Sequence, residues 1–252
     1  MADEAVQAPE WKRAEHYAAL LRADRSMLAW EWLRRNRAYQ DAAHSARLGS
    51  SEPAEAWGLH AFEPPRLASP AARPIWTRDI HPFVLEAAAE EARDPDDRFD
   101  LAHLSPFATL ARGPSCCLHL LLSDGLRAIR VDILEGSIED GPVQLRFRIG
   151  GITSAKRPLL SLRRLLSLVR RGTFSPGLHP AEARAGRHIL MLRAYDALIS
   201  GATQREIAAE LIGKEVRESR WRVNTPTQRS RTQRLVRAAG EMAGGSYRSL
   251  LR

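Results

Sequence analysis

The chain has 252 residues, enough for one large or two modest domains that each bury a hydrophobic core. Its hydrophobic fraction of 44% and charged fraction of 27% are those of an ordinary soluble protein, and its apolar runs fall short of the roughly 18 residues of a membrane-spanning helix. The N-terminus lacks an apolar signal core, and the two cysteines are adjacent (Cys116 and Cys117), which excludes a disulfide framework. We therefore expect a cytoplasmic protein without a membrane partner.

The charge is divided unevenly along the chain. Residues 112–252 carry 25 Lys and Arg against 12 Asp and Glu, a net charge of +13, whereas residues 1–111 carry 13 against 18, a net charge of −5. This asymmetry predicts two domains, an acidic one at 1–111 and a basic one at 112–252, of which the basic one is the candidate for binding nucleic acid. The alternative is an Arg-rich surface that serves only solubility.

Two helical patterns open the chain. Residues 11–23 form the first, and Asp24 is placed to cap a second helix that continues to Gly49. Aromatic side chains occur around much of the circumference of the second helix, which indicates either plain core packing or a contact surface toward another domain or protein. The residues concerned are Trp30, Trp32 and Tyr39.

The middle of the chain changes from proline-rich to β-rich. Six prolines in 49–82 predict an extended connection, after which a helix is expected around 83–93. Three β-rich runs separated by turn signals predict a three-stranded antiparallel meander over 115–150. Helices are then expected over 159–171 and 181–200. The predicted fold class is α+β, with a mainly helical N-terminal domain and a C-terminal domain whose small sheet precedes a helical region at 158–252.

The stretch GATQREIAAELIG, residues 201–213, has the pattern of the first helix of a helix-turn-helix. Thr203 and Glu206 have the T-x-x-E spacing of a capping box. The apolar residues that follow would pack inward, and a small alanine among them allows two helices to cross closely. These inward residues are Ile207, Ala208 and Leu211.

The second helix of the motif follows only after an unusually long insert, 214–224. Thr225 is a suitable N-cap, and Pro226 suits the first helical position. Helical spacing places Thr232, Leu235, Ala239 and Met242 on its inward side. This predicts an extended-turn helix-turn-helix in which the second helix, not the first, enters the major groove.

The outward face of that second helix has the chemistry of a DNA reader. Arg can bond both acceptors of guanine, Gln can pair with adenine, and no acidic residue occurs between Thr225 and Ala239. The residues predicted to read bases are Thr227, Gln228, Arg229, Ser230, Gln233 and Arg234. The residues predicted to contact phosphates are Lys214, Arg217, Arg220, Arg222, Arg231 and Arg237. The alternative is a solvated Arg-rich helix.

Patterns of catalysis are weak by comparison. The eight histidines are scattered singly without metal-ligand spacing, and neither a P-loop nor a dinucleotide glycine fingerprint occurs. His119, in an apolar strand, reads as a core histidine. We therefore expect no enzymatic activity, no metal and no cofactor.

Taken in order, these motifs resemble the FseA-like family of transcriptional activators of integrative and conjugative element excision and transfer. The resemblance lies in AWEWLRRNRAYQ near the N-terminus, CLHLLL and GPVQLRFRIGG in the β-rich part, and TQREIAAELIG followed by SRTQRLVRAAGEMAGGSYRSLL. It implies an activator that binds promoter DNA through a basic C-terminal face, whose opposite side contacts the N-terminal domain. It also implies an association with the nucleoid. RNA polymerase and an antiactivator that binds the N-terminal domain are candidate protein partners.

A second hypothesis is a protein-interaction antiactivator or regulatory scaffold whose helix-turn-helix does not bind DNA. Its motive is the acidic, aromatic-rich front half of the chain. The two hypotheses differ in whether the arginines of the motif share one exposed face.

Overall fold

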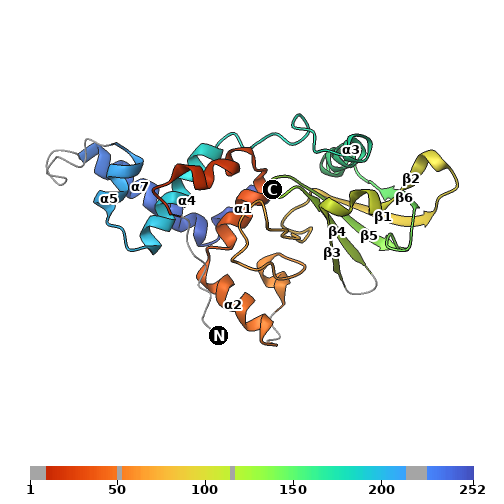
Figure 1. Ribbon diagram of the computed structural model, residues 1–252, viewed down its shortest axis with the longest axis horizontal. Coiled ribbons are helices and arrows are strands. Elements are labelled where there is room, and N and C mark those ends of the chain that lie inside the picture. Colours follow the sequence, from red (N-terminus) through yellow and green to blue (C-terminus); the bar gives the residue numbers. More distant parts are fainter. Residues whose placement is uncertain (1–9, 50–52, 114–116, 214–225) are drawn as a thin grey trace.

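The protein is an elongated mixed α/β structure, with a six-stranded sheet at one end and a group of helices at the other (Figure 1). The computed structural model describes residues 10–49, 53–113, 117–213 and 226–252. The α-helices are α1 (Arg25–Leu33), α2 (Arg37–Arg47), α3 (Lys156–Arg171), α4 (Ala185–Ile199), α5 (Gln204–Leu211) and α7 (Pro226–Ala243). The 3₁₀ helices are η1 (Ala14–Arg22), η2 (Ala54–Trp57), η3 (Pro95–Asp97), η4 (Leu101–Phe107) and η7 (Ser246–Leu251).

The sheet has the strand order β2-β6-β1-β5-β4-β3. Its strands are β1 (Val84–Glu91), β2 (Arg98–Phe99), β3 (Ala108–Arg112), β4 (Leu118–Ser123), β5 (Ala128–Glu135) and β6 (Val143–Arg148). The antiparallel hairpin of β4 and β5 is part of the predicted meander, but β6 pairs with β1 instead of β5. The three-stranded sheet predicted over 115–150 is therefore wrong, because β1 lies between β5 and β6 and runs parallel to β5.

The helix predicted over 83–93 is also wrong, since this segment forms β1. Its sequence VLEAAAEE is rich in Ala and Glu, which favour helix locally. Leu85 and Ala87, two positions apart, instead face the buried apolar side of the sheet. Pairing with two neighbouring strands and burial of this face override the local preference.

The expected helix from Asp24 to Gly49 is divided in two. Asp24 caps α1 as predicted, because its Oδ1 accepts from the backbone N–H of Met27 at 3.0 Å. Asn36 then caps α2 in the same way, with Oδ1 accepting from the N–H of Tyr39 at 3.2 Å. The N-cap signal of Asn36 ends one helix and starts the next. The preceding segment forms the 3₁₀ helix η1.

The helices predicted in the second half of the chain are present as α3 and α4. α3 ends at Gly172, which has the left-handed φ of +66° typical of a helix terminator, and α4 is followed by Gly201 at φ +82°. The connection predicted over 49–82 has η2 as its one regular helix or strand among the described residues. In the part of the chain that the structure covers, none of the helices has the length and apolar character needed to cross a membrane.

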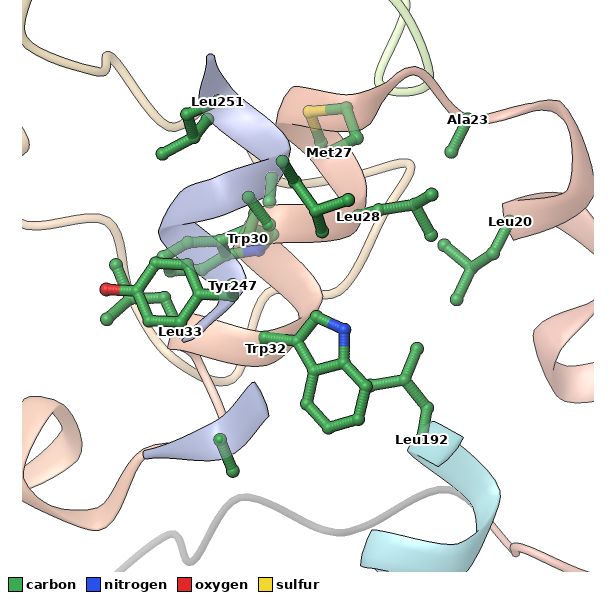
Figure 2. Close-up of a cluster of buried hydrophobic side chains, with 14 of the residues drawn as sticks. Leu20, Ala23, Met27, Leu28, Trp30, Trp32, Leu33, Leu192, Tyr247 and Leu251 are labelled. Atoms are coloured by element: carbon green, nitrogen blue, oxygen red, sulfur yellow. The ribbon is translucent and has the colours of Figure 1, made fainter. Parts of the chain in front are cut away.

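Two large hydrophobic cores organise the molecule. One lies between α3 and a face of the sheet and includes Leu165 and Leu168 of the helix. The other joins the N-terminal segment to the C-terminal helices: residues from Tyr17 to Trp76 pack with residues from Ala185 to Leu251. Figure 2 shows side chains of α1 gathered with Leu192 of α4 and Tyr247 of η7 in this second core.

The arrangement predicted from the charge, with a domain boundary between residues 111 and 112, is not matched by the structure. Strands β1, β2 and β3 precede residue 113, yet they belong to the same sheet as the three strands that follow it. The N-terminal helices likewise share a core with the end of the chain. Segments from the acidic half and the basic half therefore share both the sheet and a hydrophobic core.

Candidate nucleic-acid interface

α5 begins with the capping box that the sequence predicts. The Thr203 hydroxyl accepts from the backbone N–H of Glu206 at 3.3 Å, while Glu206 Oε2 accepts from the Thr203 backbone N–H at 2.8 Å. Both otherwise unpaired amides at the helix start are thereby satisfied. The cap fixes where α5 starts and hence which of its residues face inward.

The inward face of α5 packs against α4 and α7. Ile207 and Ala208 are fully buried, and Leu211 is half-buried. Ile207 belongs to a core that includes Ala194 and Ala197 of α4, with Leu211 packed against it. Small alanines at these positions permit close packing of the helices. The packing role predicted for this face agrees with its burial.

α7 presents the expected inward side to the same group of helices. Ala239 is fully buried, and Leu235 packs against two of the hydrophobic cores. Thr232 is also fully buried, and its hydroxyl donates to the Gln228 carbonyl at 2.9 Å, so burial leaves it paired. These contacts fix the rotation of α7 about its own axis, and hence which side chains face solvent.

The opposite side of α7 is open to solvent. Its first three turns carry a run of exposed polar and basic side chains, and Arg237 makes the only ion pair of this run within the described residues, a loose one of 3.8 Å to Glu241. The exposed residues predicted for DNA contact are Thr227, Arg229, Ser230, Arg231, Gln233, Arg234 and Arg237. Their side chains are available to a partner, and their separate roles toward bases and phosphates stay predictions.

Gln228 differs from the other residues assigned to base reading. It is half-buried, and its Oε1 atom is buried without a hydrogen-bond partner among the described residues. A side chain in this setting cannot present both its carbonyl and its amide to an adenine without first turning outward. Gln233, one turn further on, is exposed and is the better placed glutamine.

The insert at 214–224 and residue 225 lie outside the described residues. This concerns the predicted phosphate contacts Lys214, Arg217, Arg220 and Arg222, and the predicted cap Thr225. These assignments remain predictions from the sequence alone.

The aromatic residues proposed as a contact surface are buried. Trp30, Trp32 and Tyr39 each have 0% exposure. Trp30 packs edge-on against Tyr39, and Trp32 packs against Tyr195 of α4 with ring centroids 6.3 Å apart. They join the N-terminal segment to the C-terminal helices, and they do not form an exposed surface for another protein.

A buried ionic network reinforces this junction. Arg35 binds Asp196 of α4 through two nitrogens, at 2.7 and 2.8 Å, and also contacts Glu31 Oε2 at 2.5 Å. The hydroxyl of Tyr17 donates to Asp196 Oδ2 at 2.6 Å. Burial raises the pKa of Glu31, but the charges of Arg34 and Arg35 outweigh it and lower the pKa to about 2.

The sequence motifs do not predict this network. The i, i+3 and i, i+4 spacing of Glu31 with Arg34 and Arg35 is a local signal that could have suggested part of it. Nothing in the sequence around Asp196 indicates that its partner lies near the N-terminus. The network holds the helix α4, on which α5 and α7 pack, to the front of the chain.

Two segments of the chain match known protein families. Residues 151–252 match the family described as a T6SS transcription factor, DNA-binding domain. Residues 10–61 match the proteobacterial transcriptional regulator-like domain. The chain has no match among curated proteins. The two matches support a DNA-binding transcriptional regulator whose DNA-binding part contains α3, α4, α5 and α7.

Proposed function

We propose that the protein is a sequence-specific activator that reads the major groove of promoter DNA with the first half of α7. The observation that carries this proposal is the exposed face of the first three turns of α7, which has no acidic residue, within a segment that matches a DNA-binding domain. α5 acts as the positioning helix, because its buried face packs against the helices that hold α7. The protein needs no catalytic group for this role.

We further propose that the regulated genes are those for excision and transfer of an integrative and conjugative element. The support for this step is the resemblance to the FseA-like family in both the N-terminal and C-terminal motifs. RNA polymerase and an antiactivator that contacts the N-terminal domain are the protein partners that this role implies, and the cytoplasm, on the nucleoid, is the place where it would act.

The scaffold hypothesis had two motives, the acidity and the aromatic residues of the front half. Burial of the three aromatic residues removes one of them as a surface for another protein and so favours the DNA-binding proposal. The arginines of α7 for which exposure is known lie on its solvent side, as the DNA-binding hypothesis requires.

The test combines genome-wide mapping of bound DNA in the native host with gel-shift assays on the sites found. The double variant Arg229→Ala/Arg234→Ala should lose binding while its circular dichroism and unfolding transition stay those of the wild type. Arg146→Ala is the matched control, because Arg146 is an exposed arginine on β6, in the sheet at the other end of the molecule. Wild-type affinity in the double variant would overturn the assignment of α7 as the reader.

The proposed role in excision and transfer of a mobile element has a separate readout. Deletion of the gene should lower the frequency of element excision, measured by quantitative PCR of the empty chromosomal site. Binding sites confined to promoters unrelated to a mobile element would contradict the role in excision and transfer and leave the DNA-binding role intact.

A further inference from the structure

A polar cluster that DNA binding does not use lies on the face of the sheet opposite α3. His119 of β4 and Asp132 of β5 are direct partners in the antiparallel register. Their neighbours along each strand belong to the apolar core under α3, so these two side chains point to the other face. Both are buried at 6% exposure, and His119 Nδ1 lies 2.7 Å from Asp132 Oδ1.

A second histidine reaches this cluster from the proline-rich connection. The backbone N–H of His60 donates to the Ile75 carbonyl at 2.9 Å, next to the isolated bridge between Leu59 and Trp76. Ile75 packs with Leu121 of β4 and Ala128 of β5, which holds this part of the connection against the sheet. The His60 ring stacks on His119, with the ring centroids 3.5 Å apart and the planes inclined by 17°.

Hydrogen bonds within the cluster satisfy only some of its polar atoms. Arg130 donates to Asp132 Oδ1 at 2.9 Å, which, together with the contact to His119, gives that carboxylate oxygen two partners. His60 Nε2, by contrast, is buried and has no hydrogen-bond partner in the described part of the chain. Buried polar atoms in proteins nearly always have a partner, so an exception points to a water, an ion or a functional role.

We propose that His60, His119 and Asp132 form a binding site for a divalent transition-metal ion, with Zn²⁺ as the best fit. Each residue offers one ligand atom, and these three atoms all lie within 4.8 Å of one another. Two imidazoles and one carboxylate are a ligand set that zinc accepts when water or another group completes the coordination. The ion would also supply the missing partner of His60 Nε2.

Binding requires a small local rearrangement. A metal bonds an imidazole nitrogen in the plane of the ring, so two nearly parallel stacked rings cannot both direct a nitrogen at one ion. His60 is the ring that turns, because it is half-buried and lies outside the sheet, whereas the backbone of His119 is held by the β4–β5 pairing. An ion bound to both His119 Nδ1 and Asp132 Oδ1 takes the place of the proton that links these two atoms at 2.7 Å. Arg130 competes for the same carboxylate and repels a cation, so the affinity is lower than that of a structural zinc site.

The first experiment uses the metal alone. The full-length, metal-free protein is titrated with Zn²⁺ by calorimetry and with Co²⁺ by visible absorption at neutral pH. We expect one ion per chain and the absorption of a four-coordinate cobalt site. His60→Gln should weaken binding by about 10-fold or more. His103→Gln is the matched control, because the His103 side chain is 85% exposed and belongs to η4, and it should bind as the wild type does.

The second experiment needs no substitution. Zn²⁺ should shift the imidazole nitrogen resonances of His60 and His119 in the wild-type protein, and it should leave that of His103 in place. Failure to bind either metal would overturn the proposal, as would binding that His60→Gln leaves unchanged in a variant whose circular dichroism shows it to be folded. Two of the three ligands belong to the sheet and the third to the connection packed against it, and none belongs to α7, so these outcomes are independent of DNA binding.

Discussion

Arg35 and Asp196, 161 positions apart in the sequence, form a buried bidentate ion pair, with Arg35 Nε 2.7 Å from Oδ1 and Nη2 2.8 Å from Oδ2. The two side chains are 5% and 3% exposed. Because α4 carries Asp196 and packs against the helices of the candidate DNA reader, this pair ties the N-terminal segment to the DNA-binding part. The regulator-like segment and the DNA-binding segment therefore share one folded core.

The first prediction concerns this pair. Asp196→Ala leaves a buried guanidinium without its main partner, so we expect it to lower the free energy of unfolding by about 3–5 kcal/mol. Asp41→Ala is the control, because it breaks the exposed pair with Arg37 and should cost no more than about 0.5 kcal/mol. Urea unfolding followed by circular dichroism measures both values. Similar losses in the two variants would show that Asp196 does not have the structural role described.

The second prediction concerns the start of α5. Thr203→Ala removes one side of the capping box, and we expect a loss of about 1 kcal/mol in the free energy of unfolding. Thr203→Ser keeps the hydroxyl and should stay close to the wild type. Equal stability of the alanine and wild-type proteins in thermal or urea unfolding would contradict the importance of this cap.

The third prediction separates base contacts from phosphate contacts on α7. Arg231→Ala and Arg237→Ala should weaken binding to all duplexes alike and reduce the slope of log affinity against log salt by about 1 each. Arg229→Ala and Arg234→Ala should instead cost about 1–3 kcal/mol on the specific site and little on a scrambled one. Fluorescence anisotropy with both duplexes over a range of salt concentrations gives these values. A uniform effect of all four substitutions would contradict the division of roles.

The fourth prediction concerns pH. Burial lowers the pKa of His179 to about 3, and the charges of Arg164 and Arg127 act in the same direction. The pKa in the folded state is thus below the unfolded value of 6.5, so the unfolded chain binds more protons below that pH. The stability contributed by neutral His179 is complete above pH 6.5 and is lost as the pH falls toward 3.

His179→Asn removes this titration. Between pH 6.5 and 5 the variant should lose less stability than the wild type, by up to about 2 kcal/mol for one such group. Urea unfolding at several pH values in this interval is the measurement. Parallel pH profiles for the two proteins would show that His179 is not held neutral by the fold.

The capping of α5 and the inward faces of α5 and α7 could be predicted because their signals are local. The capping box of Thr203 and Glu206 depends on residues three positions apart, and the burial of Thr232 and Ala239 follows from helical periodicity. Gln228 was the weakest assignment, since it lies at the boundary between the two faces, where rotation of a single side chain decides exposure.

The fold was less predictable where partners lie far apart along the chain. The Ala- and Glu-rich segment of β1 favours a helix on its own, and only its pairing with β5 and β6 makes it a strand. The role of Trp30 and Trp32 was equally open, because the same aromatic pattern suits a core and a contact surface. Packing against α4 and η7 decides for the core.

By itself, the sequence determined the basic and acidic halves, the capped start of α5 and the two faces of α7, since charge, capping and periodicity act within a few residues. Only the tertiary structure decided that Arg35 meets Asp196, that β1 enters the sheet, and that His60 lies on His119. These contacts join segments that are distant in the chain. They form because the complete fold brings these residues together and buries them, and contacts of this kind leave no pattern in the local sequence.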